Sequence, residues 1–346
     1  MNFGIIGQSS HGNKQNIMFE DSFPSHANDL GYPFRVLREK LHLNGHNLDT
    51  IDMRPLESFD GFIFVEIPPH DTLFRRIIAL NKPLYAIVFE CPVIMPSSWR
   101  METHYYFDKI FTWDASLSGE RYVLFHWPNN FSEPVRTVPF DARKRLVCIF
   151  ATRKWSTHPL ELYSERLRAI DWFNQYHHEE MDLFGWGWSP SVRKKTKEFL
   201  LNMVRDIKGC KKSPWSWTKY RVHKGYAERK LETMRDYKFS ICYENAREIP
   251  GYITEKIFDC FLAGVVPVYL GWSGVEKFIP RECYVDKKEF GDYESLYRYI
   301  SSMEESEYNG YLAAINKFLQ GPQSDLFDAN AFAEIVATAI TGSSRA

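Results

Sequence analysis

The segment Tyr237–Leu270, YKFSICYENAREIPGYITEKIFDCFLAGVVPVYL, decides the fold of this chain. Its apolar runs predict buried strands at Phe239–Tyr243 and Val266–Leu270, separated by a polar loop and a helix at Thr254–Ala263. Gly264 stands where a C′ glycine would end that helix. A strand, a helix and a second strand in this order predict a parallel βαβ unit.

The predicted helix has a cation in an unfavourable place. Lys256 lies in the first turn, where the helix dipole and unpaired N–H groups already carry partial positive charge. The placement becomes favourable if an anion docks at this end, so a phosphate-bearing ligand is one hypothesis. The alternative is a solvated lysine at a strand–helix junction.

The same alternation runs through the rest of the chain. Further strands are expected at Asn2–Ile6, Asn47–Ile51, Gly61–Glu66, Leu84–Glu90, Lys109–Thr112 and Leu146–Phe150. Further helices are expected at Phe34–Leu43, Thr72–Leu80, Glu161–Gln175, Tyr293–Met303, Glu307–Phe318 and Asn330–Ile340. Periodicity is poor between Trp127 and Lys144, where we place the domain link. The pattern therefore predicts two α/β domains with doubly wound parallel sheets, at residues 1–140 and 141–346, and a last helix that crosses back to the first domain.

Three stretches resemble the sequence signature of glycosyltransferase family 10, the α-1,3/4-fucosyltransferases. The stretches are FSICYENAREIPGYITEKIFDCFLAGVVPVYLG at Phe239–Gly271, YAIVFECP at Tyr85–Pro92 with YYFDKIFTWD at Tyr105–Asp114, and HPLELYSERLRAIDWF at His158–Phe173 with DLFGWGW at Asp182–Trp188. They occur in the order of the family and look most like its soluble bacterial members. The resemblance implies a GT-B fold, in which two Rossmann-like doubly wound domains face a central cleft.

Two cations are the candidates for a donor diphosphate. The resemblance implies that Arg166 and Lys256 contact the diphosphate of GDP-β-L-fucose, and Arg168 competes with Arg166 for this role. Taken without the family, Arg166 is a solvated helix charge.

Polar residues around Lys256 complete the implied donor pocket. The resemblance assigns Asn245 and Tyr252 to the pocket and gives Glu255 a role beside positive charge developing at the sugar. Without the family, Asn245 is a turn residue, and Glu255 is an acid that stabilises the first turn of its helix. Tyr243 stands next to this loop and is a weaker candidate.

A carboxylate at the end of an apolar strand is the candidate general base. Glu90 follows the run LYAIVF, and ligands of open α/β sheets gather at the carboxyl ends of strands. An apolar setting raises a carboxyl pKa toward neutrality, as a general base requires. The resemblance places the catalytic glutamate of the family at Glu90, while a solvated strand-end acid is the alternative. Glu66, after GFIFV, is the second candidate for the base.

No metal or cofactor is expected besides the donor itself. Metal-dependent transferases bind a divalent cation through an Asp-x-Asp pair, and no two aspartates of this sequence are separated by one residue. Cationic side chains and a helix N-terminus would then stabilise the departing diphosphate.

Net charge, cysteine pattern and apolar runs limit the partners and the cellular compartment that we expect. The formal net charge is −1 and no basic run or basic helix stands out, so nucleic acid is not an expected partner. The six cysteines form no C-x-x-C pair, which favours free thiols in a reducing compartment. The sequence has no apolar run of membrane-spanning length and no signal-peptide pattern at its start. We therefore expect a cytoplasmic protein, peripheral at the inner membrane face through its substrate.

Together these observations predict an inverting, metal-independent fucosyltransferase. The expected acceptor is an oligosaccharide or lipid-linked glycan of surface-polysaccharide synthesis, joined α-1,3 at N-acetylglucosamine or a related sugar. Two alternatives stay open: the same mechanism with another GDP-sugar, and a non-catalytic sugar-nucleotide binding protein.

Overall fold

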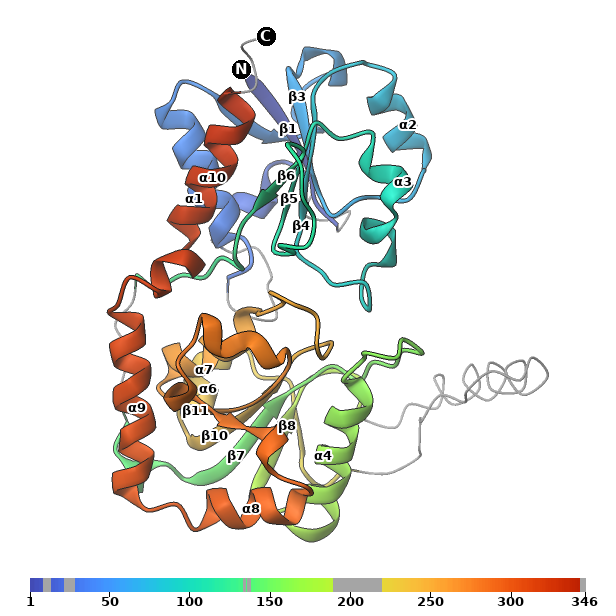
Figure 1. Ribbon diagram of the computed structural model, residues 1–346. Coiled ribbons are helices and arrows are strands. Elements are labelled where there is room, and N and C mark those ends of the chain that lie inside the picture. The colour runs from blue at the N-terminus through green and yellow to red at the C-terminus, as the bar shows by residue number, and fades with distance from the viewer. Residues whose placement is uncertain (9–13, 22–28, 133–134, 136–137, 189–219, 343–346) are drawn as a thin grey trace, which may run out of the picture.

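The computed structural model describes residues 1–8, 14–21, 29–132, 135, 138–188 and 220–342 (Figure 1). Two α/β domains lie one above the other, each built on a parallel sheet that has six strands among the described residues. This is the fold class that the sequence predicts.

The first domain contains a sheet of order β2-β1-β3-β4-β5-β6. Its strands are β1 (Asn2–Ile6), β2 (Asn47–Thr50), β3 (Gly61–Val65), β4 (Leu84–Val88), β5 (Lys109–Thr112) and β6 (Tyr122–Leu124), and its helices are α1 (Tyr32–Leu43), α2 (Thr72–Ile78) and α3 (Met101–His104). Helix α1 covers one face, and α2 and α3 cover the other (Figure 1). The central strands β3 and β4 are apolar along their whole length because both of their faces are covered.

The second domain contains a sheet of order β12-β11-β10-β7-β8-β9. Its strands are β7 (Arg145–Phe150), β8 (Met181–Phe184), β9 (His223–Gly225), β10 (Tyr237–Tyr243), β11 (Val266–Leu270) and β12 (Val285–Asp286), and its helices are α4 (Tyr163–Tyr176), α6 (Lys230–Met234), α7 (Glu255–Ala263), α8 (Tyr293–Ser301) and α9 (Glu305–Leu319). The strand order reverses between β7 and β10. A doubly wound sheet binds ligands outside the carboxyl ends of the strands at such a point.

The last helix, α10 (Ala329–Gly342), lies against the first domain beside α1 (Figure 1). The ring of Phe332 packs on Phe34, Phe89 and Phe125, with ring centroids 6.5, 5.9 and 5.3 Å away. The chain therefore crosses between the domains twice, once after β6 and once before α10.

The structure differs from the sequence-based expectations mainly at short or terminal pieces. Strand β4 ends at Val88, so Glu90 lies two residues beyond the strand that was expected to include it. Several short elements were not predicted, namely β6, β8, β9, β12, α3 and α6. Each has two to five residues, too few for a periodic pattern to show.

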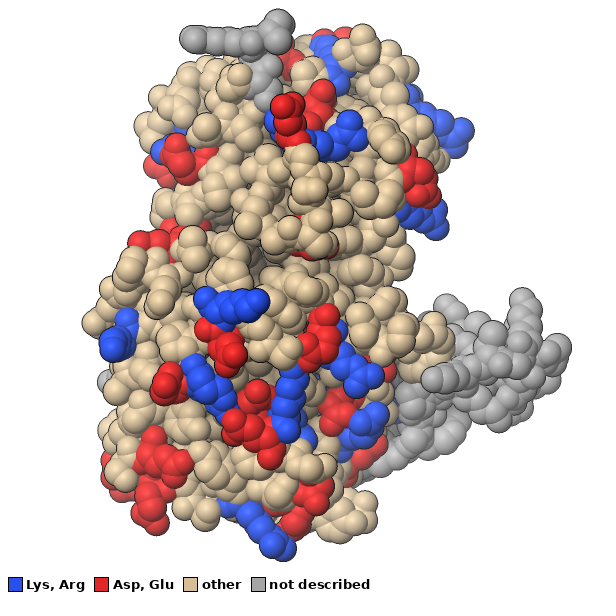
Figure 2. Space-filling view, in the orientation of Figure 1, with Lys and Arg blue, Asp and Glu red and all other residues tan. Residues whose placement is uncertain are grey.

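The charged surface is mixed. On the face shown in Figure 2, lysines and arginines alternate with acidic side chains over the lower domain and form no basic patch. A search of the described residues found no helix that is both long enough and apolar enough to span a membrane.

Candidate active site

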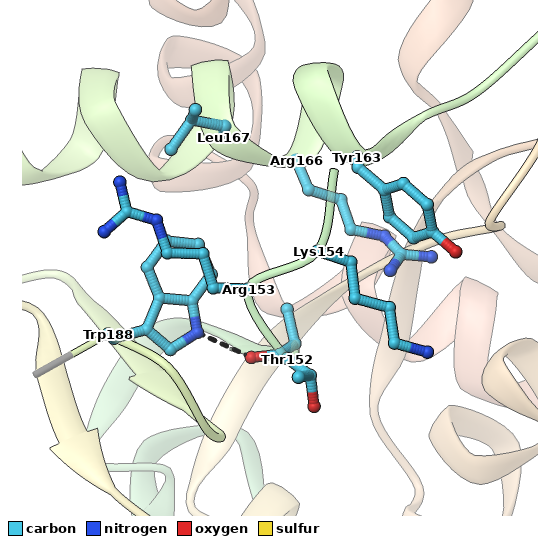
Figure 3. A pocket seen from close by; sticks show the side chains of 8 residues that line it. Thr152, Arg153, Lys154, Tyr163, Arg166, Leu167 and Trp188 are labelled. Atoms are coloured by element: carbon cyan, nitrogen blue, oxygen red, sulfur yellow. Dashed lines mark hydrogen bonds between the residues drawn. The ribbon is translucent and has the colours of Figure 1, made fainter. Parts of the chain in front are cut away.

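The candidate donor site lies at the carboxyl ends of β7 and β10, where the second sheet reverses its order. A hollow opens there between the segment after β7 and the start of α4 (Figure 3), lined by Ala151, Thr152, Arg153, Lys154, Tyr163, Arg166, Leu167 and Trp188. The side chains of Lys154 and Arg166 both line it. Arg153 turns the other way, with its guanidinium 5.4 Å from the centre of the Trp188 ring. The hollow therefore presents two cations at the place where a doubly wound sheet binds ligands.

Arg166 is held in this site by hydrogen bonds. Its side chain is buried, and it donates hydrogen bonds to the carbonyl oxygen of Tyr243 (Nη2, 2.7 Å) and to Oδ1 of Asn245 (Nη2, 2.8 Å). Burial lowers the pKa of the Arg166 guanidinium, with partial compensation by Tyr163 and Glu244. The competing candidate, Arg168, lies at the surface in an ion pair with Glu165.

A series of hydrogen bonds joins the two domains, and each of its donors points toward Glu90. Asn245 accepts from Arg166 through Oδ1, and its Nδ2 donates to the hydroxyl of Tyr252 at 3.2 Å. The same hydroxyl donates to Oε2 of Glu90 at 3.2 Å. Four of the predicted site residues therefore form one connected unit, although Glu90 belongs to the first domain and the other three to the second.

Glu90 lies half-buried in the turn that follows β4. Burial raises the pKa of its carboxyl group, Lys256 and Lys154 oppose this rise, and Glu255 adds to it. These effects show that the first turn of α7 and the segment after β7 both face Glu90. A carboxylate whose pKa is raised is better matched to accept a proton near neutral pH.

Lys256 is held by carboxylates. Its Nζ lies 2.8 Å from Thr254 Oγ1, 3.3 Å from Glu244 Oε2 and 3.5 Å from Glu255 Oε1. Burial works to lower the pKa of Lys256, but Glu255 and Glu244 raise it overall, so the ammonium stays charged. Its side chain is 19% exposed, which leaves one side open to a ligand. Lys256 is therefore not the freely solvated lysine of the alternative interpretation, and docking of an anion beside it stays a prediction.

Glu255 is the first residue of α7. Burial works to raise the pKa of its carboxyl group, but Lys256 and Lys230 lower it overall. The carboxylate is therefore ionised beside Lys256.

The two weaker candidates have other places in the structure. The ring of Tyr243 is 1% exposed and packs in the core of the second domain, so Tyr243 contributes its carbonyl oxygen to Arg166 and not its hydroxyl to the base. The carboxylate of Glu66 is buried and accepts three hydrogen bonds from groups of the first domain, so it is not placed to meet an acceptor.

Two site residues were missed by the sequence reasoning. Glu244 is fully buried and binds both the N–H and the hydroxyl of Thr254 as well as Lys256. Lys154 lies in the hollow beside Arg166. The signal that would have identified both is position, because each follows a central strand next to the reversal of strand order.

Within the described ranges, no group of three or more His, Cys, Asp or Glu side chains is arranged to hold a metal ion.

Most of the second domain matches a known protein family. Its residues 161–321 match the family model described as "Glycosyltransferase family 10 (fucosyltransferase) C-term". We call residues 161–321 the family 10 segment. The family predicted by resemblance is therefore confirmed, and Arg166, Asn245, Tyr252, Glu255 and Lys256 all lie within the family 10 segment.

Curated relatives of this chain include plant, bacterial and mammalian fucosyltransferases. The chain is 33% identical over 89 residues to the alpha-(1,3)-fucosyltransferase FucT of Helicobacter pylori, a match that covers 25% of this chain and 18% of that protein. It is 34% identical over 83 residues to an alpha-(1,4)-fucosyltransferase of Arabidopsis thaliana, which covers 22% of this chain and 20% of the relative. The matched segments therefore span about a fifth of the length of these relatives.

Solved structures show that the likeness of fold extends over both domains. An alpha1,3-fucosyltransferase superimposes with a TM-score of 0.55 at 14% identity, covering 99% of this chain and 90% of that one. HepE of Anabaena, in complex with UDP and glucose, superimposes with a TM-score of 0.53 at 12% identity, covering 99% and 100% of the two chains. The chain has the two-domain GT-B fold that the resemblance implied.

Proposed function

We propose that this chain is an inverting glycosyltransferase that moves L-fucose from GDP-β-L-fucose to a hydroxyl group of a glycan, without a metal ion. The observation that best supports the proposal is the series Arg166–Asn245–Tyr252–Glu90. It joins a cation of the family 10 segment to a carboxylate of the other domain. A transferase needs these two functions on opposite sides of its reacting bond: a base for the acceptor and positive charge for the leaving group.

The proposed reaction is a single displacement. Glu90 takes the proton of the acceptor hydroxyl while the hydroxyl oxygen forms a bond to the anomeric carbon of fucose. The bond from that carbon to the β-phosphate oxygen breaks, and GDP leaves with the bonding electrons. Attack from the face opposite to GDP inverts the configuration, so a β-linked donor yields an α-fucoside.

The departing diphosphate is stabilised by fixed positive charge. Arg166 is held by two acceptors, and Lys256 is held by Glu244 and Glu255, so little reorganisation is needed as charge develops on GDP. The ionised carboxylate of Glu255 stands beside positive charge that grows on the sugar. Because side chains supply the cations, the proposal includes no metal.

For the acceptor, we propose N-acetylglucosamine or a related sugar, fucosylated through an α-1,3 linkage, in an oligosaccharide or lipid-linked glycan of surface-polysaccharide synthesis. The Helicobacter pylori relative supports this linkage through its name, alpha-(1,3)-fucosyltransferase. The Arabidopsis relative is an alpha-(1,4)-fucosyltransferase, so the assay must resolve both linkages.

We also propose that the chain works in the cytoplasm, at the inner membrane face when its acceptor is lipid-linked. The support is chemical: Cys91, Cys148, Cys242, Cys260 and Cys283 are all buried free thiols in the structure, and such thiols persist in a reducing compartment. Fractionation of the native cells tests the location directly. Recovery from the periplasm or the outside of the cell would contradict it.

The donor assay tests the function. Purified protein is incubated in EDTA with GDP-fucose, GDP-mannose and UDP-sugars over a panel of galactose- and N-acetylglucosamine-containing acceptors, and nucleotide release is followed. We expect GDP release from GDP-fucose that one acceptor class accelerates. Release from another donor would replace the substrate and keep the mechanism. GDP binding without release from any donor would favour a non-catalytic binder.

A variant of the base separates enzyme from binder. Glu90→Gln removes the proton acceptor and keeps the size of the side chain, so turnover should fall by roughly 100-fold or more while donor affinity stays the same. Glu102→Gln is the matched control, because Glu102 is exposed on α3 of the same domain. Equal turnover in Glu90→Gln and wild type would exclude Glu90 as the base.

A further inference from the structure

Glu66 is a buried carboxylate that the proposed reaction does not use. It follows β3 directly, is 3% exposed, and has a backbone φ of 68°, a left-handed conformation that few non-glycine residues adopt. Strain of this kind at a residue beside a candidate site often has a functional cause.

All the hydrogen bonds of the Glu66 carboxylate hold the structure that carries Glu90. Its Oε1 accepts from the backbone N–H groups of Phe89 (2.7 Å) and Glu90 (2.8 Å). Its Oε2 accepts from the hydroxyl of Ser98 at 2.6 Å. The strand β4 ends where Glu66 binds these two N–H groups, because a carboxylate has replaced the neighbouring strand as their acceptor.

The carbonyl groups of the same turn are also fixed. Trp113 donates its indole N–H to the carbonyl of Phe89 at 2.7 Å, and Trp99 donates to the carbonyl of Glu90 at 2.9 Å. Both residues are therefore bound through their N–H and through their carbonyl group. Of the four groups, only the two N–H groups depend on a side chain that can change its charge.

We propose that Glu66 is a positioning residue, which fixes the backbone at Phe89–Glu90 so that the Glu90 carboxylate meets Tyr252 of the second domain. The inference rests on the proposed function in so far as it concerns the base. It concerns a residue that touches neither donor nor acceptor.

The charged groups around Glu66 and Glu90 determine how Glu66 acts on Glu90. Burial raises the pKa of Glu66 to about 7, although Ser98 and the backbone of Glu90 lower it, and repulsion between the two carboxylates raises it further. Glu90 itself faces Lys256 and Glu255 from α7 and Lys154 from the segment after β7. Below about pH 7 Glu66 is largely protonated, so it acts on Glu90 through the geometry of the turn and not through its charge.

Two conservative variants separate the geometry of Glu66 from its charge. Glu66→Asp keeps the charge but is one methylene shorter, so it cannot reach both N–H groups. Glu66→Gln keeps the reach and the acceptor oxygen but has no charge. Ser98→Ala is the matched control, because it removes one bond of the carboxylate and leaves both N–H bonds in place.

The first measurement does not depend on activity. Hydrogen exchange is measured at the amides of Phe89 and Glu90 in the full-length protein. Glu66→Asp should exchange roughly tenfold faster or more, because bonds to a charged acceptor are lost, while Glu66→Gln and Ser98→Ala keep their protection. Unchanged protection in Glu66→Asp would overturn the positioning role whether or not the protein is a transferase.

The second measurement is the pH profile of turnover. Relative to wild type, Glu66→Asp should lower kcat at every pH and leave the KM for GDP-fucose unchanged, while Glu66→Gln should keep both kcat and the acidic limb. A general folding defect would lower the active fraction of both variants, and full kcat in folded Glu66→Asp would overturn the positioning role. If wild type releases no GDP with any donor, the proposed function fails, and hydrogen exchange still decides the positioning role. Thermal unfolding and GDP binding establish that each variant is folded, and Glu66→Gln serves alone if Glu66→Asp does not fold.

Discussion

Replacing Tyr252 by phenylalanine removes the one hydroxyl that links the base to the donor pocket in the Arg166–Glu90 series. That hydroxyl donates to Glu90 Oε2 and accepts from Asn245 Nδ2, both at 3.2 Å. Its hydrogen bond lowers the pKa of Glu90 and so partly offsets the rise caused by burial. Without it, the pKa of Glu90 rises further, and the acidic limb of the pH–rate profile should move to higher pH.

The size of the effect follows from the geometry. A hydrogen bond to a charged group contributes about 1.5–3 kcal/mol, and 3.2 Å is long for a hydroxyl donor, so we take about 1.5 kcal/mol. This corresponds to a roughly tenfold loss of kcat/KM at pH values below the limb, with recovery toward the wild-type value above it. Because the Asn245 amide loses its hydrogen-bond partner, the free energy of unfolding should fall by about 1–3 kcal/mol.

The assay is GDP release as a function of pH, with unfolding by urea measured on the same samples. Tyr237→Phe is the matched control, because its hydroxyl also donates to a buried carboxylate, Asp182 Oδ2 at 2.7 Å, in the core of the second domain. The control should lose stability without a shift of the limb. If the Tyr252→Phe limb stays in place while its stability falls, the coupling between Tyr252 and Glu90 is refuted.

Further predictions test the other parts of the site and the fold. Arg166→Lys cannot reproduce the planar fork that contacts two acceptors, so the KM for GDP-fucose should rise roughly tenfold or more, and an unchanged KM would remove Arg166 from the donor site. Glu244→Gln should raise the same KM roughly fivefold by loosening Lys256, with little change in kcat; equal loss of both would show a general folding defect. Burial raises the pKa of Glu66 to about 7, so ionisation of Glu66 opposes folding. The protonated carboxyl group stabilises the fold fully below the unfolded pKa of about 4.3, and this stabilisation is lost as pH rises through about 7. In Glu66→Gln, the free energy of unfolding measured in urea should therefore change less between these two pH values. Phe332→Ala should lower the free energy of unfolding by about 3–5 kcal/mol, because α10 docks on the first domain through this ring; a change below 1 kcal/mol would show that the docking contributes little.

The family assignment and the general course of the chain were readable from sequence because they depend on local patterns. Apolar runs predicted the bounds of β1, β5 and β11 without error. A left-handed backbone at Gly264 ends α7 at the residue that the glycine indicated. These features arise from residues close together in the chain, whose spacing carries the signal.

The working arrangement of the site depends on contacts that no local pattern contains. Arg166 meets Asn245 across 79 residues, and Tyr252 meets Glu90 across 162 residues and two domains. Sequence could name these four residues through family resemblance, but their order in one hydrogen-bonded series required the tertiary structure.

The difference between local pattern and tertiary contact also explains the different environments of Glu66, Glu90 and Glu244. Glu66 and Glu90 both follow apolar strands and look alike as sequence, yet the Glu66 carboxylate accepts three hydrogen bonds within the first domain and the Glu90 carboxylate accepts one from Tyr252 of the second domain. The position of Glu244 after a central strand was a signal, but its full burial could not be predicted, because a buried carboxylate is stable only when donors from elsewhere in the fold meet it. The residue type and strand position are local properties, whereas burial and hydrogen-bond partners are created when distant segments pack together.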